Sequence, residues 1–319
     1  MTTYIIRRLM QSVIVFFLVT LLVFLGMRML PGDPIYMIIS RAASETATEM
    51  QLDKLREQYG MDRSMAVQYI DWLGGVFRGD LGVSILNNTN IREEIFRRLP
   101  ITLHLGVLAL IVSFLFGVPM GIIAAVRRGT WIDTVVTSLA NIGITIPVFW
   151  LGYILIYILA LQLHWIPEFF GYTSPFEDFW LHTKKIIMPV FCLAVTTVAG
   201  VARQARSSML EVMGQDYIRT AWSKGLRERA VIFKHGLKNG MIPVMVFLGL
   251  GFSMIIGGQV LIETVFVIPG MGLLAVNAMG NSDYPVIQGV ILVIAVIVLL
   301  TNLLVDLSYG WLDPRVQYR

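Results

Sequence analysis

The sequence has little charge and almost no cysteine. Only 14% of its 319 residues are Asp, Glu, Lys or Arg, whereas soluble domains carry about 25%. The single cysteine, Cys192, lies in an apolar stretch. It can form no intrachain disulfide and supports no cysteine-based metal site, so we expect a small buried residue. The low charge argues against a soluble protein, and a net charge of +4 reflects basic loops rather than a nucleic-acid surface.

The motifs of several enzyme classes are also missing. The chain contains no Gly-x-x-x-x-Gly-Lys-Ser/Thr, so it does not bind ATP through a P-loop, and it contains no His-Glu-x-x-His. Its histidines are far apart in sequence: His104, His164, His182 and His235. Ser253 has no histidine at similar depth in another apolar run, which argues against a membrane-embedded hydrolase. We therefore expect no enzymatic activity, no cofactor and no metal site in this chain.

Long apolar runs take the place of those motifs. Hydrophobic residues make up 56% of the chain, and several uncharged runs reach the length of about 18 residues that a helix needs to cross a bilayer. The first run, 9–27, follows Arg7-Arg8 and is longer than the core of a signal peptide. We expect it to be an uncleaved span. The sequence therefore predicts an all-α polytopic membrane protein embedded in a lipid bilayer.

Hydropathy and charge together predict six transmembrane helices. We expect them at 9–29, 101–126, 134–161, 186–202, 241–262 and 286–305. Pro119 lies inside the second span and Pro147 inside the third. Short basic loops mark the cytoplasmic side of a membrane protein. The loops at 127–128 and 203–238 and the basic tail fall on the same side as Arg7-Arg8, so we expect both termini to be cytoplasmic.

This topology divides the chain into three parts. Residues 1–30 form the first transmembrane helix, 31–100 an external folded region, and 101–319 a five-helix core with a cytoplasmic loop at 203–240. Within the external region, helical spacing at 50–59 predicts a helix, and glycines at both ends of Gly79-Asp80-Leu81-Gly82 predict a turn. We expect 263–285 to be a looped or re-entrant external segment.

Ionisable residues are almost absent from the middle of the predicted spans. Carriers driven by ions or protons usually place Asp, Glu or His there. This chain has neutral polar residues at such positions instead: Asn141, Gln259, Gln288 and Asn302. They either form hydrogen bonds between helices or line a passage for a solute. A self-contained secondary transporter or channel remains an alternative, but the composition favours a passage that receives its energy from another protein.

The most basic short segment lies between the fourth and fifth predicted spans. Its basic residues outnumber the acidic Glu211, Asp216 and Glu228, and they are Arg203, Arg206, Arg219, Lys224, Arg227, Arg229, Lys234 and Lys238. Asp216 can start a helix, eight residues without Gly or Pro follow it, and Gly225 can end that helix. The pattern predicts a short helix on the cytoplasmic face, suited to gripping a soluble partner.

These residues resemble a known family. Tyr217-x-Arg219-Thr220-Ala221-x-x-Lys224-Gly225-Leu226, followed by His235-x-x-Lys238-Asn239-x-x-Ile242-Pro243, is similar to the cytoplasmic motif of binding-protein-dependent ABC importer permeases of the dipeptide/oligopeptide/nickel branch. Further segments agree in order along the whole chain, among them Leu30-Pro31-Gly32-Asp33-Pro34, Ile262-Glu263-Thr264-Val265-Phe266, Asp283-Tyr284-Pro285 and Asp313-Pro314-Arg315. In this branch the chain resembles the paired permease that has the longer external region.

The resemblance implies a fold, a setting and a set of partners. The fold would be the MetI-like permease fold of type I ABC importers, with six transmembrane helices, in a bacterial or archaeal cytoplasmic membrane. An external solute-binding protein would deliver a peptide-like solute. The partners would be a second homologous permease subunit and two P-loop ATPase subunits, which would hydrolyse the ATP, and no nucleic acid.

The same resemblance identifies the segment at 216–227 as the coupling helix, which docks in a cleft of the ATPase. Its contact residues would be Asp216, Tyr217, Arg219, Thr220, Ala221, Lys224, Gly225 and Leu226. Gly225 would let the chain turn tightly where a side chain would clash. Where the broader importer consensus has Glu-Ala-Ala, this chain has Arg219-Thr220-Ala221, so the location of the helix carries over better than any single contact.

Overall fold

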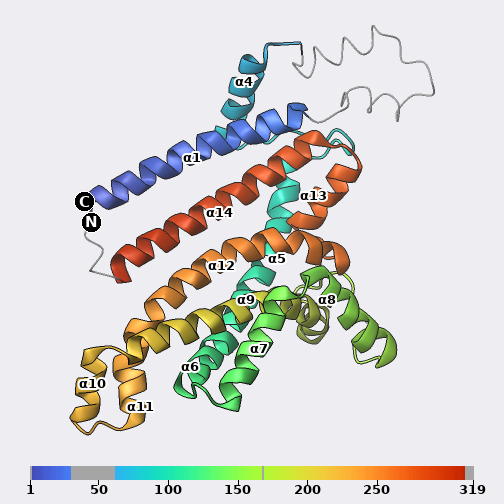
Figure 1. Ribbon diagram of the computed structural model, residues 1–319. Coiled ribbons are helices and arrows are strands. Elements are labelled where there is room, and N and C mark those ends of the chain that lie inside the picture. Colours follow the sequence, from blue (N-terminus) through green and yellow to red (C-terminus); the bar gives the residue numbers. More distant parts are fainter. Residues whose placement is uncertain (1, 30–61, 167–168, 313–319) are drawn as a thin grey trace. The chain divides into compact units, whose positions relative to one another are not determined.

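The regular structure of the chain is almost entirely helical (Figure 1). The computed structural model describes residues 2–29, 62–166 and 169–312. Within these ranges the β structure consists of one isolated bridge between Val83 and Asn90. The all-α prediction is therefore confirmed. The predicted helix at 50–59 lies outside the described residues.

The chain divides into two compact units, which are described separately below. Unit 1 comprises Met1–Ile6, Thr102–Pro269 and Leu300–Arg319, and unit 2 comprises Arg7–Ile101 and Gly270–Leu299. The three-part division at residues 30 and 100 stays a prediction about the membrane topology, because compactness alone does not report which segments face outward.

In the part of the chain that the structure describes, five continuous helical segments are long and apolar enough to cross a membrane. They are found in α1 (Thr2–Met29), in α5 (Ile91–Val112) with its continuation to Val126, in α9 (Phe179–Met213), in Glu228–Val265, which includes α12 (Leu237–Val265), and in α14 (Tyr284–Leu312). A sixth apolar segment is a pair of helices, α7 (Trp131–Thr145) and α8 (Val148–Leu155), continued by the π turn η2 (Ile156–Gln162) and bent by 100° at its break. Counting the pair as one span gives the six that the sequence predicts.

The break between α7 and α8 differs from the continuous third span that the sequence predicts. Ile146 and Pro147 have extended backbone, with ψ of 125° and 127°. A proline ring disfavours the helical conformation of the residue before it and supplies no N–H donor. Pro119 in the second span has a milder effect, because a π turn at Ser113–Gly117 comes before α6 (Val118–Val126) and the proline sits in the first turn of that helix.

α9 is much longer than the predicted span at 186–202. It begins after Asp178, whose side chain accepts a hydrogen bond from the N–H of Leu181 at 2.9 Å, and it continues through Pro189 to Met213. Its 35 residues make a rod of about 50 Å, well beyond the roughly 30 Å of hydrocarbon in a bilayer. Hydropathy located only the apolar middle of the helix, and both polar ends are helical as well.

α9 is the central helix of unit 1, and α6, α7 and α12 pack along it. One apolar cluster joins it to α6 and α12 through Val118, Val201, Ala205, Val244 and Leu248. Gly121 of α6 allows the closest approach: a Cβ there would collide with the carbonyl oxygen of Ala202 and lie 2.6 Å from the Cβ of Ala205. The α6–α9 contact therefore brings the two backbones together in the small-residue manner of membrane helices.

Unit 2 contains two helices that the sequence did not predict, α4 (Met65–Phe77) and α13 (Met271–Gly280). Its core joins the start of α5 to α13 and α14 through Ile91, Ile95, Met271, Ala275, Ala278, Val286, Ile287 and Val290. The predicted turn at 79–82 is present, and Gly79 and Gly82 have φ of 76° and 87°. Asp283 holds the next loop, because its carboxylate accepts hydrogen bonds from the hydroxyl of Ser84 and the N–H of Ile85.

Candidate functional site

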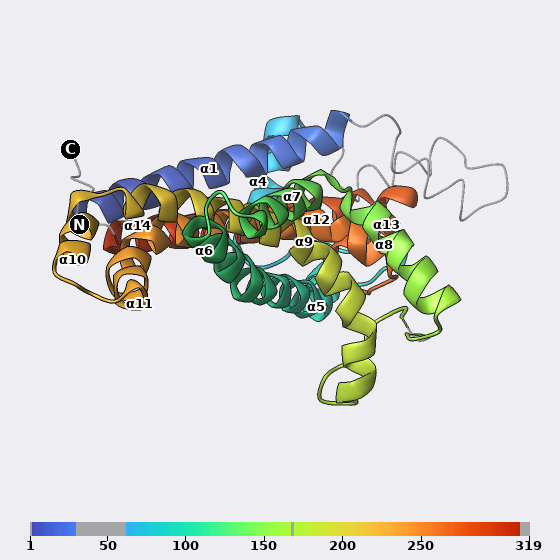
Figure 2. The ribbon, with the colours of Figure 1, turned by 60° about the horizontal axis from the view of Figure 1, so that its bottom comes forward.

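The basic segment between α9 and α12 forms a small helical unit beyond the ends of those two helices (Figure 2). α10 (Asp216–Ser223) follows α9 after a two-residue link, and α11 (Glu228–Ala230) leads through the π turn η3 (Val231–Gly236) into α12. The predicted short helix is confirmed, and it begins at Asp216 as expected. The sequence did not predict that α9 itself continues to Met213 and so carries α10 at its tip.

A specific glycine cap ends α10. The N–H of Gly225 donates to the carbonyl of Trp222 at 2.9 Å, and the N–H of Leu226 donates to the carbonyl of Ala221 at 3.4 Å. With φ of 72° at Gly225, these two bonds form a Schellman motif. A Cβ at Gly225 would meet nothing within 4 Å. The expected clash is therefore wrong: the left-handed backbone, not crowding, favours glycine here.

The inner face of α10 is apolar and small. Ile218 and Ala221 are 0% and 5% exposed and pack with Val231 of η3, and we call these three residues the seat cluster. Val212 and Met213 at the end of α9 pack against the seat cluster. Ala221, predicted as a contact residue, thus faces inward. α10 is held firmly to α9 by burial rather than by charge.

The outer face of α10 presents polar and aromatic side chains. All the predicted contact residues except Ala221 are exposed: Asp216, Tyr217, Arg219, Thr220, Lys224, Gly225 and Leu226. Trp222 joins them with 43% exposure. Asp216 and Arg219 form an ion pair of 3.3 Å whose side chains are 96% and 75% exposed, which contributes little to stability. The hydroxyl of Tyr217 accepts a hydrogen bond from the side-chain amide of Asn239 at 2.9 Å.

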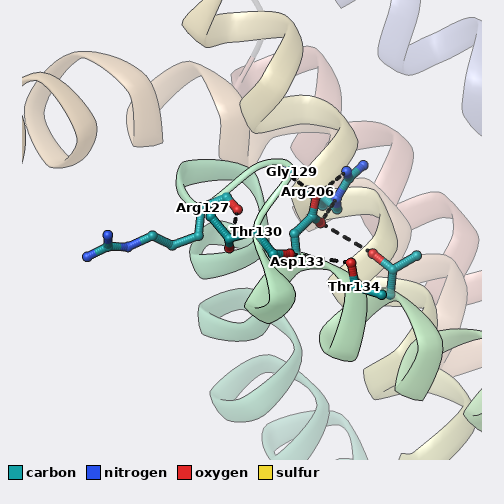
Figure 3. Close-up of polar contacts among 7 residues, drawn as sticks. Arg127, Gly129, Thr130, Asp133, Thr134 and Arg206 are labelled. Atoms are coloured by element: carbon teal, nitrogen blue, oxygen red, sulfur yellow. Dashed lines mark hydrogen bonds and ion pairs between the residues drawn. The ribbon is translucent and has the colours of Figure 1, made fainter.

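A second ionic contact holds the C-terminal half of α9, and the sequence analysis missed it (Figure 3). Arg206 of α9 donates to both carboxylate oxygens of Asp133, from Nε at 2.6 Å and from Nη2 at 2.9 Å. The backbone N–H of Gly129 donates to the same carboxylate at 3.0 Å. Asp133 is 7% exposed. No pattern within the sequence links residues 73 positions apart, so Arg206 was counted only as a loop charge.

The candidate passage residues fall into different surroundings. Asn141 on α7 is exposed, and Asn302 on α14 accepts a hydrogen bond from Ser253 of α12 at 3.2 Å, which is an interhelical bond. Gln259 on α12 is 1% exposed, and neither polar atom of its amide has a hydrogen-bond partner within the described residues. Gln288 lies in unit 2, and its buried Nε2 also lacks a partner there.

The structure also contains a buried carboxylate whose burial the sequence did not predict. Glu263 directly follows the predicted fifth span at 241–262, and it is 0% exposed. The hydroxyl of Thr102 on α5 donates to its Oε1 at 2.6 Å. One turn away on each helix, a Cβ at Gly106 would lie 2.7 Å from the amide nitrogen of Gln259. α5 and α12 therefore approach closely along a polar line.

Comparison with known families assigns the chain to one of them. The family described as binding-protein-dependent transport system inner membrane component matches residues 117–318, and the N-terminal part of such membrane components matches residues 1–106. The chain belongs to this family. It is a multi-pass inner-membrane permease component, not an enzyme, and a system of this kind implies a binding protein and an ATPase as partners.

Relatives of known name match over the full chain. A probable peptide ABC transporter permease of Sinorhizobium fredii is 41% identical over 318 residues, with 100% of both chains covered. An oligopeptide transport system permease of Bacillus subtilis is 39% identical with the same coverage. A dipeptide transport system permease of Escherichia coli is 36% identical, again over 100% of each chain.

A solved structure supports the fold independently. The inward-facing methionine ABC transporter MetNI contains a chain that superposes with a TM-score of 0.56 at 18% identity, covering 69% of this permease and 96% of that chain. This similarity extends to the fold only. It confirms the predicted MetI-like architecture of type I ABC importers.

Proposed function

We propose that this permease moves peptide-like solutes, dipeptides or oligopeptides, across the inner membrane. An external solute-binding protein delivers the solute, and a second homologous permease subunit completes the passage. Two P-loop ATPase subunits dock from the cytoplasm on the segment at 216–227 and supply the energy. The substrate class follows the named relatives, all three of which are peptide permeases.

One observation carries the docking proposal: α10 has a buried inner face and an exposed outer face that carries aromatic side chains. Ile218 anchors the helix with no exposed surface, while Trp222 and Tyr217 remain 43% and 40% exposed. Exposed aromatic residues on a rigid helix make strong contacts when a partner's pocket covers them. Lys224 and Arg219 add positive charge that speeds and orients the approach of an acidic cleft.

For the passage we propose the neutral amides of Asn141, Gln259, Gln288 and Asn302. An amide both donates and accepts hydrogen bonds, as a peptide bond does. Such groups hold a passing peptide more weakly than charges would, because hydrogen bonds to charged groups are stronger than those between neutral ones. Gln259 is the strongest candidate among the four passage residues. Its buried amide has no hydrogen-bond partner within the described residues, and such a group is destabilising until something pairs with it.

The decisive experiment compares two substitutions of the same shape at Gly225. Asp and Asn both tolerate the left-handed backbone, but only Asp adds a negative charge to the docking turn. In the reconstituted complex with its binding protein and short alanine peptides, we expect Gly225→Asp to abolish peptide-stimulated ATP hydrolysis. Gly225→Asn should keep most of it, because a Cβ at this position meets no neighbour.

Membrane insertion and expression level should be the same for both variants. Peptide-stimulated hydrolysis in Gly225→Asp at the wild-type rate would rule out docking at this turn. Replacing the alanine peptides with other solutes in the wild-type complex tests the substrate class separately, since a wrong solute leaves docking intact.

A further inference from the structure

The Asp133–Arg206 contact connects the helix that carries α10 to the bent helix pair. We propose that this ion pair is the positioning contact that makes α7, and through it α8, follow the movements of the coupling helix. The inference rests on the proposed docking of ATPase subunits on α10. It assigns a role in coupling to two residues that take no part in docking.

The first step is the rigid attachment of α10 to α9. Only Gly214 and Gln215 separate the two helices, and the N–H of Gln215 donates to the carbonyl of Val212 at 3.1 Å. The seat cluster packs directly on Val212 and Met213 of α9. A displacement of α10 by a partner is therefore transmitted to α9, because a packed apolar contact does not deform continuously.

The second step is the geometry of the ion pair. Both oxygens of Asp133 are bound by one guanidinium group, at 2.6 and 2.9 Å. The Gly129 N–H and the Thr137 hydroxyl at 3.4 Å fix the carboxylate further. A bidentate Arg–carboxylate pair fixes the relative orientation of the two side chains as well as the distance between them. The side chains of Asp133 and Arg206 are 10% and 29% exposed, so water screens this contact less than it screens the exposed Asp216–Arg219 pair on α10.

The third step concerns the rest of the α7–α9 interface, which is made of small groups. A Cβ at Gly143 of α7 would lie 3.0 Å from the Cβ of Ala199 and 3.4 Å from Val195. Smooth contacts of this kind bring helices close, and packed helices slide along one another by small shear movements. Within the described residues no other ion pair joins α7 to α9. The hydroxyl of Thr196 on α9 donates to the carbonyl of Gly143 on α7 at 3.4 Å, a longer and uncharged contact. Asp133–Arg206 is therefore the strongest directional contact that sets the axial register of α7 against α9.

The last step leads from α7 to α8. A shift of α7 along its axis reaches the extended Ile146–Pro147 break, where the chain bends by 100°. Beyond the break, α8 rests on α12: a Cβ at Gly152 would lie 3.2 Å from Val265 and 3.3 Å from Phe266. A sliding movement of α9 is thereby turned into a movement of α8 against α12.

The test neutralises each partner within the assembled complex. Asp133→Asn and Arg206→Gln should lower the ratio of peptide-stimulated to basal ATP hydrolysis by about 5- to 30-fold. Arg203→Gln, which removes an exposed charge one turn earlier on α9, should leave the ratio unchanged. The reversed pair Asp133→Arg with Arg206→Asp should recover part of it, which a purely local effect of either single change would not produce.

A distance measurement separates coupling from stability. Spin labels at Trp131 and Tyr153, both exposed, on a Cys192→Ala background should report an ATP-dependent change in the wild type. Arg206→Gln should abolish that change. If the neutral variants do not assemble, Arg206→Lys keeps the charge without the two-pronged geometry and should show an intermediate loss.

The outcomes distinguish the two proposals. A wild-type complex without peptide-stimulated hydrolysis would overturn the proposed function. A wild-type response with normal coupling and a normal label movement in the neutral variants, or in Arg206→Lys where only that variant assembles, would overturn the role of the ion pair alone.

Discussion

α9 and α10 follow one another in the chain but are held by different physics. α9 lies among α6, α7 and α12, and its backbone approaches α6 so closely that Gly121 has no room for a Cβ. α10 has one buried side, centred on Ile218, and a glycine at its end that has empty space around it. α9 is therefore packed on several sides, whereas α10 leaves one side exposed, where we propose that a partner docks.

Two Asp–Arg pairs show the same difference. Asp133–Arg206 joins two helices and is mostly buried, whereas Asp216–Arg219 lies within one helix and is mostly exposed. A buried pair leaves an uncompensated charge when one partner is removed, and an exposed pair leaves a hydrated one. The packing of α7 on α9 therefore depends on its ion pair, while α10 keeps its charges exposed for the partner that we propose.

The largest effect is expected from adding one methyl group to the scaffold. Gly121→Ala would drive a Cβ into the carbonyl oxygen of Ala202, and backbone cannot move aside as a side chain can. We expect a loss of about 3 kcal/mol in stability, seen as a lower temperature of unfolding in mild detergent.

The matched control is Gly257→Ala on α12. A Cβ at Gly257 would meet nothing within 4 Å, and alanine forms helices better than glycine. The unfolding temperature should stay the same or rise slightly. Equal destabilisation by both substitutions would contradict the close α6–α9 contact.

The next largest effect is expected on the binding of the ATPase, and it should leave the packing of α6, α7, α9 and α12 unchanged. Trp222→Ala removes an exposed aromatic ring from the outer face of α10. We expect the affinity for the ATPase subunits to fall by about 2 kcal/mol, or roughly 30-fold, without a change in the unfolding temperature of the permease. Binding of the purified ATPase to the permease in nanodiscs measures this directly.

Trp165→Ala provides the comparison, because Trp165 is 70% exposed but lies between the predicted spans at 134–161 and 186–202, on the side opposite the predicted cytoplasmic loop at 203–240. Its substitution should not alter ATPase binding. A similar loss of affinity in both variants would mean that general damage, rather than docking on α10, causes the effect.

The sequence predicted the parts of this design that depend on local pattern. The start of α10 at Asp216 and its cap at Gly225 follow from cap preferences, and six apolar segments follow from hydropathy. The full length of α9 could not be predicted from hydropathy, because the helix continues into its polar ends, where hydropathy carries no signal. The break at Pro147 was open to prediction from the proline rule, but the apolar run around it favoured a continuous span.

Contacts between distant segments could not be predicted from one sequence. Asp133 with Arg206 and Thr102 with Glu263 join residues far apart in the chain, and only the packed fold brings each pair together. Which side of α10 is buried was also undetermined, so Ala221 was expected outside although it lies in the seat cluster. Local chemistry thus located the short helix α10, and tertiary packing decided which of its sides is buried.

The smallest effect is expected from Arg219→Gln, and it sharpens the comparison of the two ion pairs. In double-mutant cycles with Asp216→Asn, the exposed pair should show an interaction energy well below about 1 kcal/mol, falling further in high salt. The cycle of Asp133→Asn with Arg206→Gln should give about 1–3 kcal/mol and change little with salt. Equal interaction energies in the two cycles would mean that burial does not make the Asp133–Arg206 pair stronger than the Asp216–Arg219 pair.

A rate measurement on Arg219→Gln shows where its charge acts. Slower association of the ATPase at unchanged permease stability would show that the exposed charge acts on the partner and not on the fold.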